Sequence, residues 1–348
     1  MSSAQRLWGF TLPIATAFIL LALCLVLLVP APTAVQAADP TYTDGLAFGN
    51  KEQTCSLAIG DFNNDGHLDV IAGNSDPEDF DCSYFDFDLG EAYPPATSYL
   101  YLNDHSGQIS QTVALQTQGD VVQGDLDGNG TLDIVAGNAV WLNDGTAVFT
   151  TTNTSPFRPA SHGQLALGDL NGDGQLDLAA TAFPSPTQLF FNDGNGNFNF
   201  VQALPPAERI ALGDLDGDGR LDIMRDDTIH YNTGGGDFMA DTQFLPDIGF
   251  STYLLLADVN GDNALDIIGG SFLGRVEVYF NDGRGNFPER NDVFGDAKSV
   301  TDLVAADLNG DGSLDLLTAN AGEQKNHLFL NNGFSDRQCG RTEKPSLP

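Results

Sequence analysis

Short apolar runs recur along residues 42–333, separated by segments rich in Gly, Asn and Asp. The runs are about four to eight residues long and contain mainly Leu, Ile, Val, Phe and Tyr, which is typical of β-strands. In one repeat the successive runs are QLALGD, LDLAAT and LFFND, and a Phe-bearing fourth run follows the turn NDGNGNF. Turns of this Asn-Asp-Gly type supply the positive φ that tight hairpins need. The pattern therefore predicts antiparallel meanders of four strands.

The acidic loop between the first and second runs occurs six times and sets the repeat length. Its leading residues are Asp61, Asp125, Asp169, Asp214, Asp258 and Asp307, with spacings of 64, 44, 45, 44 and 49 residues. A period of about 45 residues is typical of a propeller in which each repeat forms one blade. We therefore predict an all-β fold, a β-propeller of six blades, with seven as the alternative if the long first spacing contains a degenerate blade. Residues 42–49 are expected to pair as a strand with the last repeat, which closes the ring and removes its exposed edges.

Oxygen-bearing side chains occupy fixed positions of each loop, in the pattern D-x-[DN]-x-[DN]-x-x-x-D. Carboxylate and amide oxygens are hard ligands that select Ca²⁺. Position 7 varies freely, as expected where only its backbone carbonyl binds, and position 6 is Gly except for Asn263, which also tolerates positive φ. An EF-hand is excluded because it needs Glu at position 12, where these loops have Ala, Arg, Gly or Thr.

The loops thus predict up to six Ca²⁺, one per loop, as the only cofactor. The candidate ligands at positions 1, 3, 5, 7 and 9 are Asp61, Asn63, Asp65, His67, Asp69, Asp125, Asp127, Asn129, Thr131, Asp133, Asp169, Asn171, Asp173, Gln175, Asp177, Asp214, Asp216, Asp218, Arg220, Asp222, Asp258, Asn260, Asp262, Ala264, Asp266, Asp307, Asn309, Asp311, Ser313 and Asp315.

The charge of the chain excludes several classes of partner. Its 348 residues contain 14 Lys plus Arg against 48 Asp plus Glu, a formal net charge of -34. Nucleic acids and anionic membrane surfaces are excluded as partners, because binding phosphate needs clustered Lys and Arg. The chain is 41% hydrophobic, which provides enough material for a core and argues against disorder. The loops hold 19 of the 48 acidic residues, so bound metal explains much of the acidity.

Residues 1–37 have the composition of a secretory signal. One charged residue, Arg6, precedes an apolar run over 8–29, and Val35 and Ala37 place small residues before a cleavage site at Ala38. The alternative is an uncleaved membrane anchor, because the run is as long as a spanning helix of about 20 residues. In either case we expect export, with the protein secreted or at the cell surface. The propeller is expected over 38–333, followed by a polar tail over 334–348.

One segment, residues 74–97, interrupts the period within the first blade. It mixes five aromatic residues with seven acidic ones, a composition that suits sugar stacking or a cationic partner, or else packing on its own blade. Cys55 and Cys82 lie close enough in sequence to form a disulfide across this insertion, which leaves Cys339 unpaired; three reduced thiols are the alternative.

The repeats resemble the FG-GAP and VCBS repeats of integrin-α-type β-propellers, in the bacterial style. The resemblance rests on Phe48-Gly49, on Phe294-Gly295 and on loops such as GDLNGDGQLDL, and covers residues 42–333. It implies Ca²⁺ in the loop between the first two strands of each blade, on the oxygen positions given above. It also implies extracellular adhesion, ligand binding or scaffolding.

No catalytic motif stands out in the sequence. The five His residues form neither HxH nor HExxH pairs, and Ser271 lacks the spacing of a nucleophile elbow. We therefore expect a non-enzymatic module that binds an extracellular protein or carbohydrate. A polysaccharide-active lyase or hydrolase on a calcium-rich propeller, and a purely structural surface protein, are the alternatives.

Overall fold

The regular elements of the chain are β-strands throughout the residues that the structure describes. This computed structural model describes residues 53–75, 97–103, 109–115, 117, 119–137, 139–152, 163–245, 248, 251–271, 276–293, 300–320 and 326–331. All of them belong to one compact unit, Phe48–Pro348. Within these ranges no helix is long and apolar enough to cross a bilayer.

Within these described ranges, twenty-three strands form six separate antiparallel sheets. The first sheet contains β1 (Gln53–Gly60), β2 (Asp69–Ser75), β3 (Ser98–Asn103) and β4 (Ile109–Leu115), and the second β5 (Val121–Gly124), β6 (Asp133–Ala136), β7 (Ala139–Asn143) and β8 (Phe149–Thr152). The third contains β9 (Leu165–Gly168), β10 (Asp177–Ala182), β11 (Ser185–Asn192) and β12 (Phe198–Pro206), and the fourth β13 (Ile210–Gly213), β14 (Asp222–Arg225), β15 (Thr228–Tyr231) and β16 (Asp241–Phe244). The fifth contains β17 (Ser251–Ala257), β18 (Asp266–Ser271), β19 (Val276–Phe280) and β20 (Glu289–Val293), and the sixth β21 (Val300–Ala306), β22 (Asp315–Asn320) and β23 (His327–Phe329).

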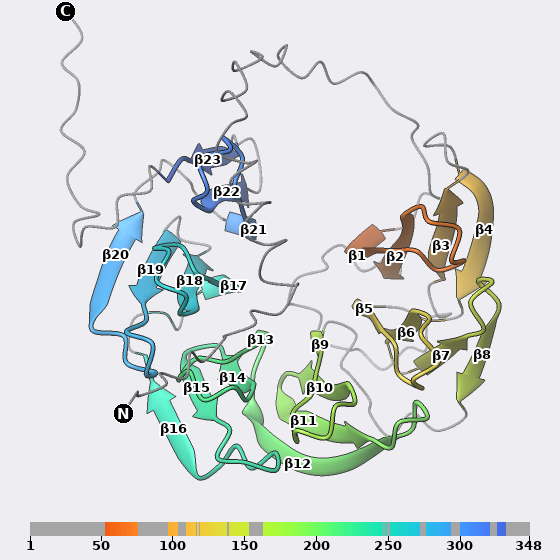
Figure 1. The fold of residues 1–348 in the computed structure, drawn as a ribbon, viewed down its shortest axis with the longest axis horizontal. Coiled ribbons are helices and arrows are strands. Elements are labelled where there is room, and N and C mark those ends of the chain that lie inside the picture. The colour runs from red at the N-terminus through yellow and green to blue at the C-terminus, as the bar shows by residue number, and fades with distance from the viewer. Residues whose placement is uncertain are drawn as a thin grey trace, which may run out of the picture. The chain divides into compact units, whose positions relative to one another are not determined.

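Each sheet is one blade of a β-propeller, and its strands pair in chain order as a meander. The first strands of successive blades, β1, β5, β9, β13, β17 and β21, contact one another in that order and lie nearest the centre in Figure 1. The predicted all-β propeller is confirmed. The described residues form six blades, which favours the prediction of six over the alternative of seven.

Several predictions concern segments that lie outside the described residues. The sixth sheet has three described strands, and the strand predicted over 42–49 to complete it is not among the described residues. The same holds for the segment 1–37, most of the insertion, Cys82, Cys339 and the tail 334–348. Ring closure, export and the disulfide therefore stay predictions.

The hydrophobic core lies between neighbouring blades. One cluster joins Phe62 and Ile71 of the first blade with Val121 and Ile134 of the second, and similar clusters occupy the next four junctions. Full burial of one such side chain contributes about 1.5–3 kcal/mol, so the blades are stabilised by packing on each other. This packing holds the acidic loop of each blade against its neighbour.

Candidate metal centre

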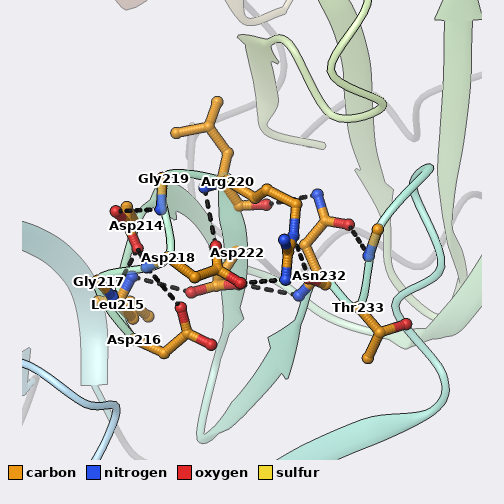
Figure 2. A network of polar contacts seen from close by, with 12 residues as sticks. Asp214, Leu215, Asp216, Gly217, Asp218, Gly219, Arg220, Asp222, Asn232 and Thr233 are labelled. Carbon is orange, nitrogen blue, oxygen red and sulfur yellow. Dashed lines mark hydrogen bonds and ion pairs between the residues drawn. The ribbon is translucent and has the colours of Figure 1, made fainter.

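The six acidic loops connect the first and second strands of their blades, where the sequence places them. We name them loop 1 to loop 6, over residues 61–69, 125–133, 169–177, 214–222, 258–266 and 307–315, and number their positions 1 to 9. In loop 4, both oxygens of Asp214 accept backbone N–H groups: Oδ1 from Gly217 at 2.8 Å and Oδ2 from Gly219 at 2.9 Å (Figure 2). The other five loops bond their first Asp to position 6 in the same way, at 2.8–2.9 Å. The first carboxylate therefore folds each loop into a tight turn.

Position 6 of every loop has a left-handed backbone. The five glycines have φ between 83° and 89°, and Asn263 in loop 5 has φ 67°. Asn is among the few residues that adopt this region at low cost, so the substitution leaves the turn intact. Loop 5 therefore keeps the shared conformation, as the sequence predicted.

Position 9 is the first residue of the second strand, and its Asp is fully buried in all six loops. Asp222 accepts the N–H of Leu215 on Oδ2 and the N–H of Asn232 on Oδ1, both at 2.8 Å (Figure 2). Equivalent pairs of bonds, of 2.7–3.1 Å, are made by Asp69, Asp133, Asp177, Asp266 and Asp315. Each of these carboxylates thus joins the loop start, the second strand and the end of the third strand.

Burial changes the acidity of these carboxyls. It raises the pKa of Asp177, Asp222 and Asp266 to about 6, and it raises the pKa of Asp69 and Asp133 as well. The two backbone N–H donors lower the pKa, whereas the other carboxylates of the loop raise it. A cation placed among these groups would favour the charged form and offset both unfavourable effects.

Two loops bring three carboxylates together. One oxygen each from Asp125, Asp127 and Asp133 in loop 2, and from Asp214, Asp216 and Asp218 in loop 4, lie within 4.8 Å of one another. The other four loops have Asn at position 3, and its Nδ2 donates to Oδ2 of the Asp at position 5, at 2.9–3.0 Å. Three carboxylate oxygens thus lie together in loops 2 and 4, at positions 1, 3 and 9 and at positions 1, 3 and 5 respectively. This hard, anionic donor set fits Ca²⁺, and a nitrogen or sulfur ligand set is absent from the loops, His67 at position 7 of loop 1 being the only such side chain.

In all six loops the residue at position 7 donates its backbone N–H to Oδ1 of the residue at position 5, at 2.7–2.9 Å. The donors are His67, Thr131, Gln175, Arg220, Ala264 and Ser313. The side chains of Thr131 and Arg220 add contacts to the third strand and its end. Thr131 donates its hydroxyl to the carbonyl of Asn143, at 2.9 Å. Arg220 forms an ion pair with Oδ2 of Asp218 and donates Nε–H to the carbonyl of Asn232, at 2.8 Å (Figure 2). Loop 4 therefore contains its own cationic side chain.

The sequence analysis missed the role of the Asn that ends the third strand, which it interpreted only as a turn residue. Asn143 donates Nδ2–H to the carbonyl of Phe62, at 2.8 Å, and thereby bonds the second blade to loop 1 of the first. Asn192, Asn232, Asn281 and Asn331 repeat this bond to position 2 of the preceding loop, at 2.6–2.9 Å. The sequence contained a signal for this role. Every third run ends in Asn, although a hairpin turn alone would accept several residue types at this position.

The comparisons with known proteins agree with this architecture. The model of the FG-GAP-like repeat matches residues 125–180, 169–224 and 258–318. No curated protein is similar enough in sequence to count as a relative.

The chain is similar to several solved structures at low sequence identity. BBS1N, from a crystal structure with ARL6DN, has a TM-score of 0.50 and 11% identity, over 83% of this chain and 81% of that one. The V. cholerae biofilm matrix protein Bap1 has a TM-score of 0.44 and 16% identity, over 73% of this chain and 42% of that one. The exotype rhamnogalacturonan lyase YesX has a TM-score of 0.48 and 14% identity, over 80% and 55%.

Proposed function

The chain is an FG-GAP repeat β-propeller, and we propose that it is an exported, calcium-stabilised module that binds an extracellular ligand. The observation that carries the calcium part is the sixfold repetition of one loop geometry. In every loop the first carboxylate closes the turn, and in loops 2 and 4 three carboxylate oxygens lie within 4.8 Å of one another. All six copies have carboxylate or amide oxygens at positions 1, 3, 5 and 9, a hard donor set that suits Ca²⁺.

Calcium would act on this chain mainly through charge. Six Ca²⁺ would change the formal net charge from -34 to -34 + 12 = -22. With free Ca²⁺ at ten times Kd, one site adds about 1.4 kcal/mol, and six add about 8 kcal/mol. This is comparable to the whole net stability of a domain, about 5–15 kcal/mol.

Thermal unfolding tests the calcium part of the proposal. The purified protein is melted in Ca²⁺, in EDTA, and in EDTA with excess Mg²⁺. We expect a marked rise in Tm with Ca²⁺ and little effect of Mg²⁺, which prefers octahedral sites with several waters. Equal Tm values in Ca²⁺ and EDTA would refute calcium stabilisation.

The N-terminal sequence of the protein recovered from its host tests export. A mature chain that begins at Ala38 in the medium supports secretion, and a full-length chain in the membrane fraction supports an anchor. A full-length chain in the cytosolic fraction contradicts export.

The proposed role is non-enzymatic binding. Its support is the chain's chemistry: 19 of the 48 acidic side chains lie in the candidate metal loops, and the sequence shows no nucleophile motif. A screen of polysaccharides for binding, with soluble products assayed in the same samples, separates the alternatives. Binding without products supports a binding module, whereas released products would assign a lyase or hydrolase.

A further inference from the structure

A polar groove lies at the junction of the fourth and fifth blades, beside loop 4. Its volume is about 530 Å³, and it is lined by loop 4, by β16 and by the turn between β19 and β20. The lining includes Asp216, Tyr231, Gln243, Phe244, Asp241 and Arg284. The fourth repeat departs from the pattern of the other repeats at two of these residues.

The first departure is Asp216, at position 3 of loop 4. Loop 4 alone has a carboxylate at both position 3 and position 5, because each other loop has Asn at one of them. Where position 3 is Asn, its amide bonds the Asp at position 5; in loop 4, Arg220 takes over this bond to Asp218. Asp216 keeps one backbone bond, from Asp218 N–H at 3.1 Å, and lines the groove as an acceptor.

The second departure is Tyr231, which precedes the Asn at the end of the third strand. The equivalent residues are apolar: Leu102, Leu142, Phe191, Phe280 and Leu330. The Tyr231 hydroxyl lies 2.6 Å from the carbonyl of Gly285 and 2.8 Å from Oε1 of Gln243, so its single O–H donates to one of them at a time. A Cβ at position 285 would come within 2.8 Å of this hydroxyl, which explains the glycine there.

These contacts leave Gln243 ready to bind a ligand. Its carbonyl faces the hydroxyl of Tyr231, and no hydrogen bond of its amide nitrogen is found among the described residues. The register equivalent in the third blade is Gln202, which pairs with Leu189 as Gln243 pairs with Ile229, but the third blade has Phe191 where the fourth has Tyr231. The fourth blade therefore differs from the third in having a tyrosine hydroxyl that contacts this amide.

Phe244 supplies the apolar part of the groove. It ends β16, and 63% of its surface is exposed. A groove whose lining contains an exposed aromatic residue, a carboxylate and an amide matches a pyranose, whose C–H face packs on the ring while its hydroxyls bond the polar groups. The lining includes Asp216, Asp241 and Arg284, so without a metal ion in loop 4 its net charge is -1, which disfavours uronate or phosphate groups.

We propose that this groove binds a neutral pyranose unit of a glycan, with Phe244 as the stacking surface and Asp216 and Gln243 as hydrogen-bonding partners. The inference rests on the proposed function, because it names the ligand class of the same extracellular module. Because Asp216 is also a candidate metal ligand of loop 4, the titrations are made both in Ca²⁺ and in EDTA.

The test is calorimetric titration of the full chain with neutral probes and one anionic probe. The neutral probes are glucose, galactose, mannose and N-acetylglucosamine, free and as oligosaccharides, and the anionic probe is oligogalacturonate. The variants are Phe244→Ala and Gln243→Ala, with Phe200→Ala and Gln202→Ala as matched controls in the third blade. Phe200 is also an exposed ring on an outermost strand, 54% exposed.

We expect at least one neutral probe to bind, with a loss of about tenfold or more in both groove variants and no change in the controls. Tyr231→Phe removes the hydroxyl alone and should weaken binding less. Binding of no neutral probe, binding of the anionic probe alone, or equal losses in groove and control variants would each overturn the proposal. Tm in Ca²⁺ and EDTA, measured on the same samples, reports separately whether the calcium part holds.

Discussion

The bond between neighbouring blades through Asn192 gives a prediction with a magnitude. This side chain is 4% exposed and makes three hydrogen bonds. Nδ2–H donates to Leu126 of the preceding loop at 2.8 Å, and Oδ1 accepts the N–H groups of Gly194 and Gly196, both at 3.1 Å. Asn192→Ala removes all three while the backbone bond to Asp177 remains. At about 1 kcal/mol per bond, we expect the free energy of unfolding to fall by about 3 kcal/mol.

The assay is thermal and urea unfolding followed by circular dichroism, at fixed Ca²⁺. A loss of about 3 kcal/mol corresponds to a fall in Tm of about 6 °C for a domain of this size. Asn195→Ala is the control, because Asn195 is exposed in the same turn and its amide bonds only Asp193, at 3.2 Å. A control effect below about 0.5 kcal/mol is expected. If Asn192→Ala costs no more than the control, the bond between blades does not contribute to stability and the reasoning is wrong.

Three further predictions concern loop 4, pH and one glycine. Arg220→Gln removes the cationic side chain from loop 4, so Ca²⁺ should raise the Tm of this variant more than that of the unmodified chain. Arg284→Gln makes the same charge change outside the loop and should not show this larger rise. Equal rises in the two variants would contradict the role of Arg220. Burial raises the pKa of Asp177, Asp222 and Asp266 from 3.8 to about 6, so the folded state binds protons more tightly than the unfolded state. Without metal, the free energy of unfolding in urea should therefore be higher at pH 5 than at pH 7, and a lower value at pH 5 would contradict the raised pKa values. Gly236→Ala should lower the free energy of unfolding by about 2–4 kcal/mol, because the φ of Gly236 is 78° and a Cβ there would overlap Phe191. Gly235→Ala is the control and should cost about 1 kcal/mol, because the space around Gly235 is open. Equal losses in chemical denaturation would contradict the packing argument.

Much of the architecture could be predicted from the sequence, because its signals are local and repeated. The loop motif, the runs around it and the hairpin turns each lie within a few residues of one another, and six copies gave the period and favoured six blades over seven. The left-handed backbone of Asn263 was also predictable, because it depends on the residue type at one loop position.

Other features depended on contacts between blades, whose partner residues cannot be identified from the sequence alone. Asn232 bonds Leu170, which lies 62 residues earlier, and Asn143 bonds Phe62, which lies 81 residues earlier. The same applies to the groove, where Tyr231 of one blade meets Gly285 of the next. Local periodicity therefore determined the repeat, its loops and its candidate metal chemistry. Only the packing of one blade on the next decided which loop each buried Asn bonds and where a ligand can bind, because these depend on distances between residues far apart in the chain.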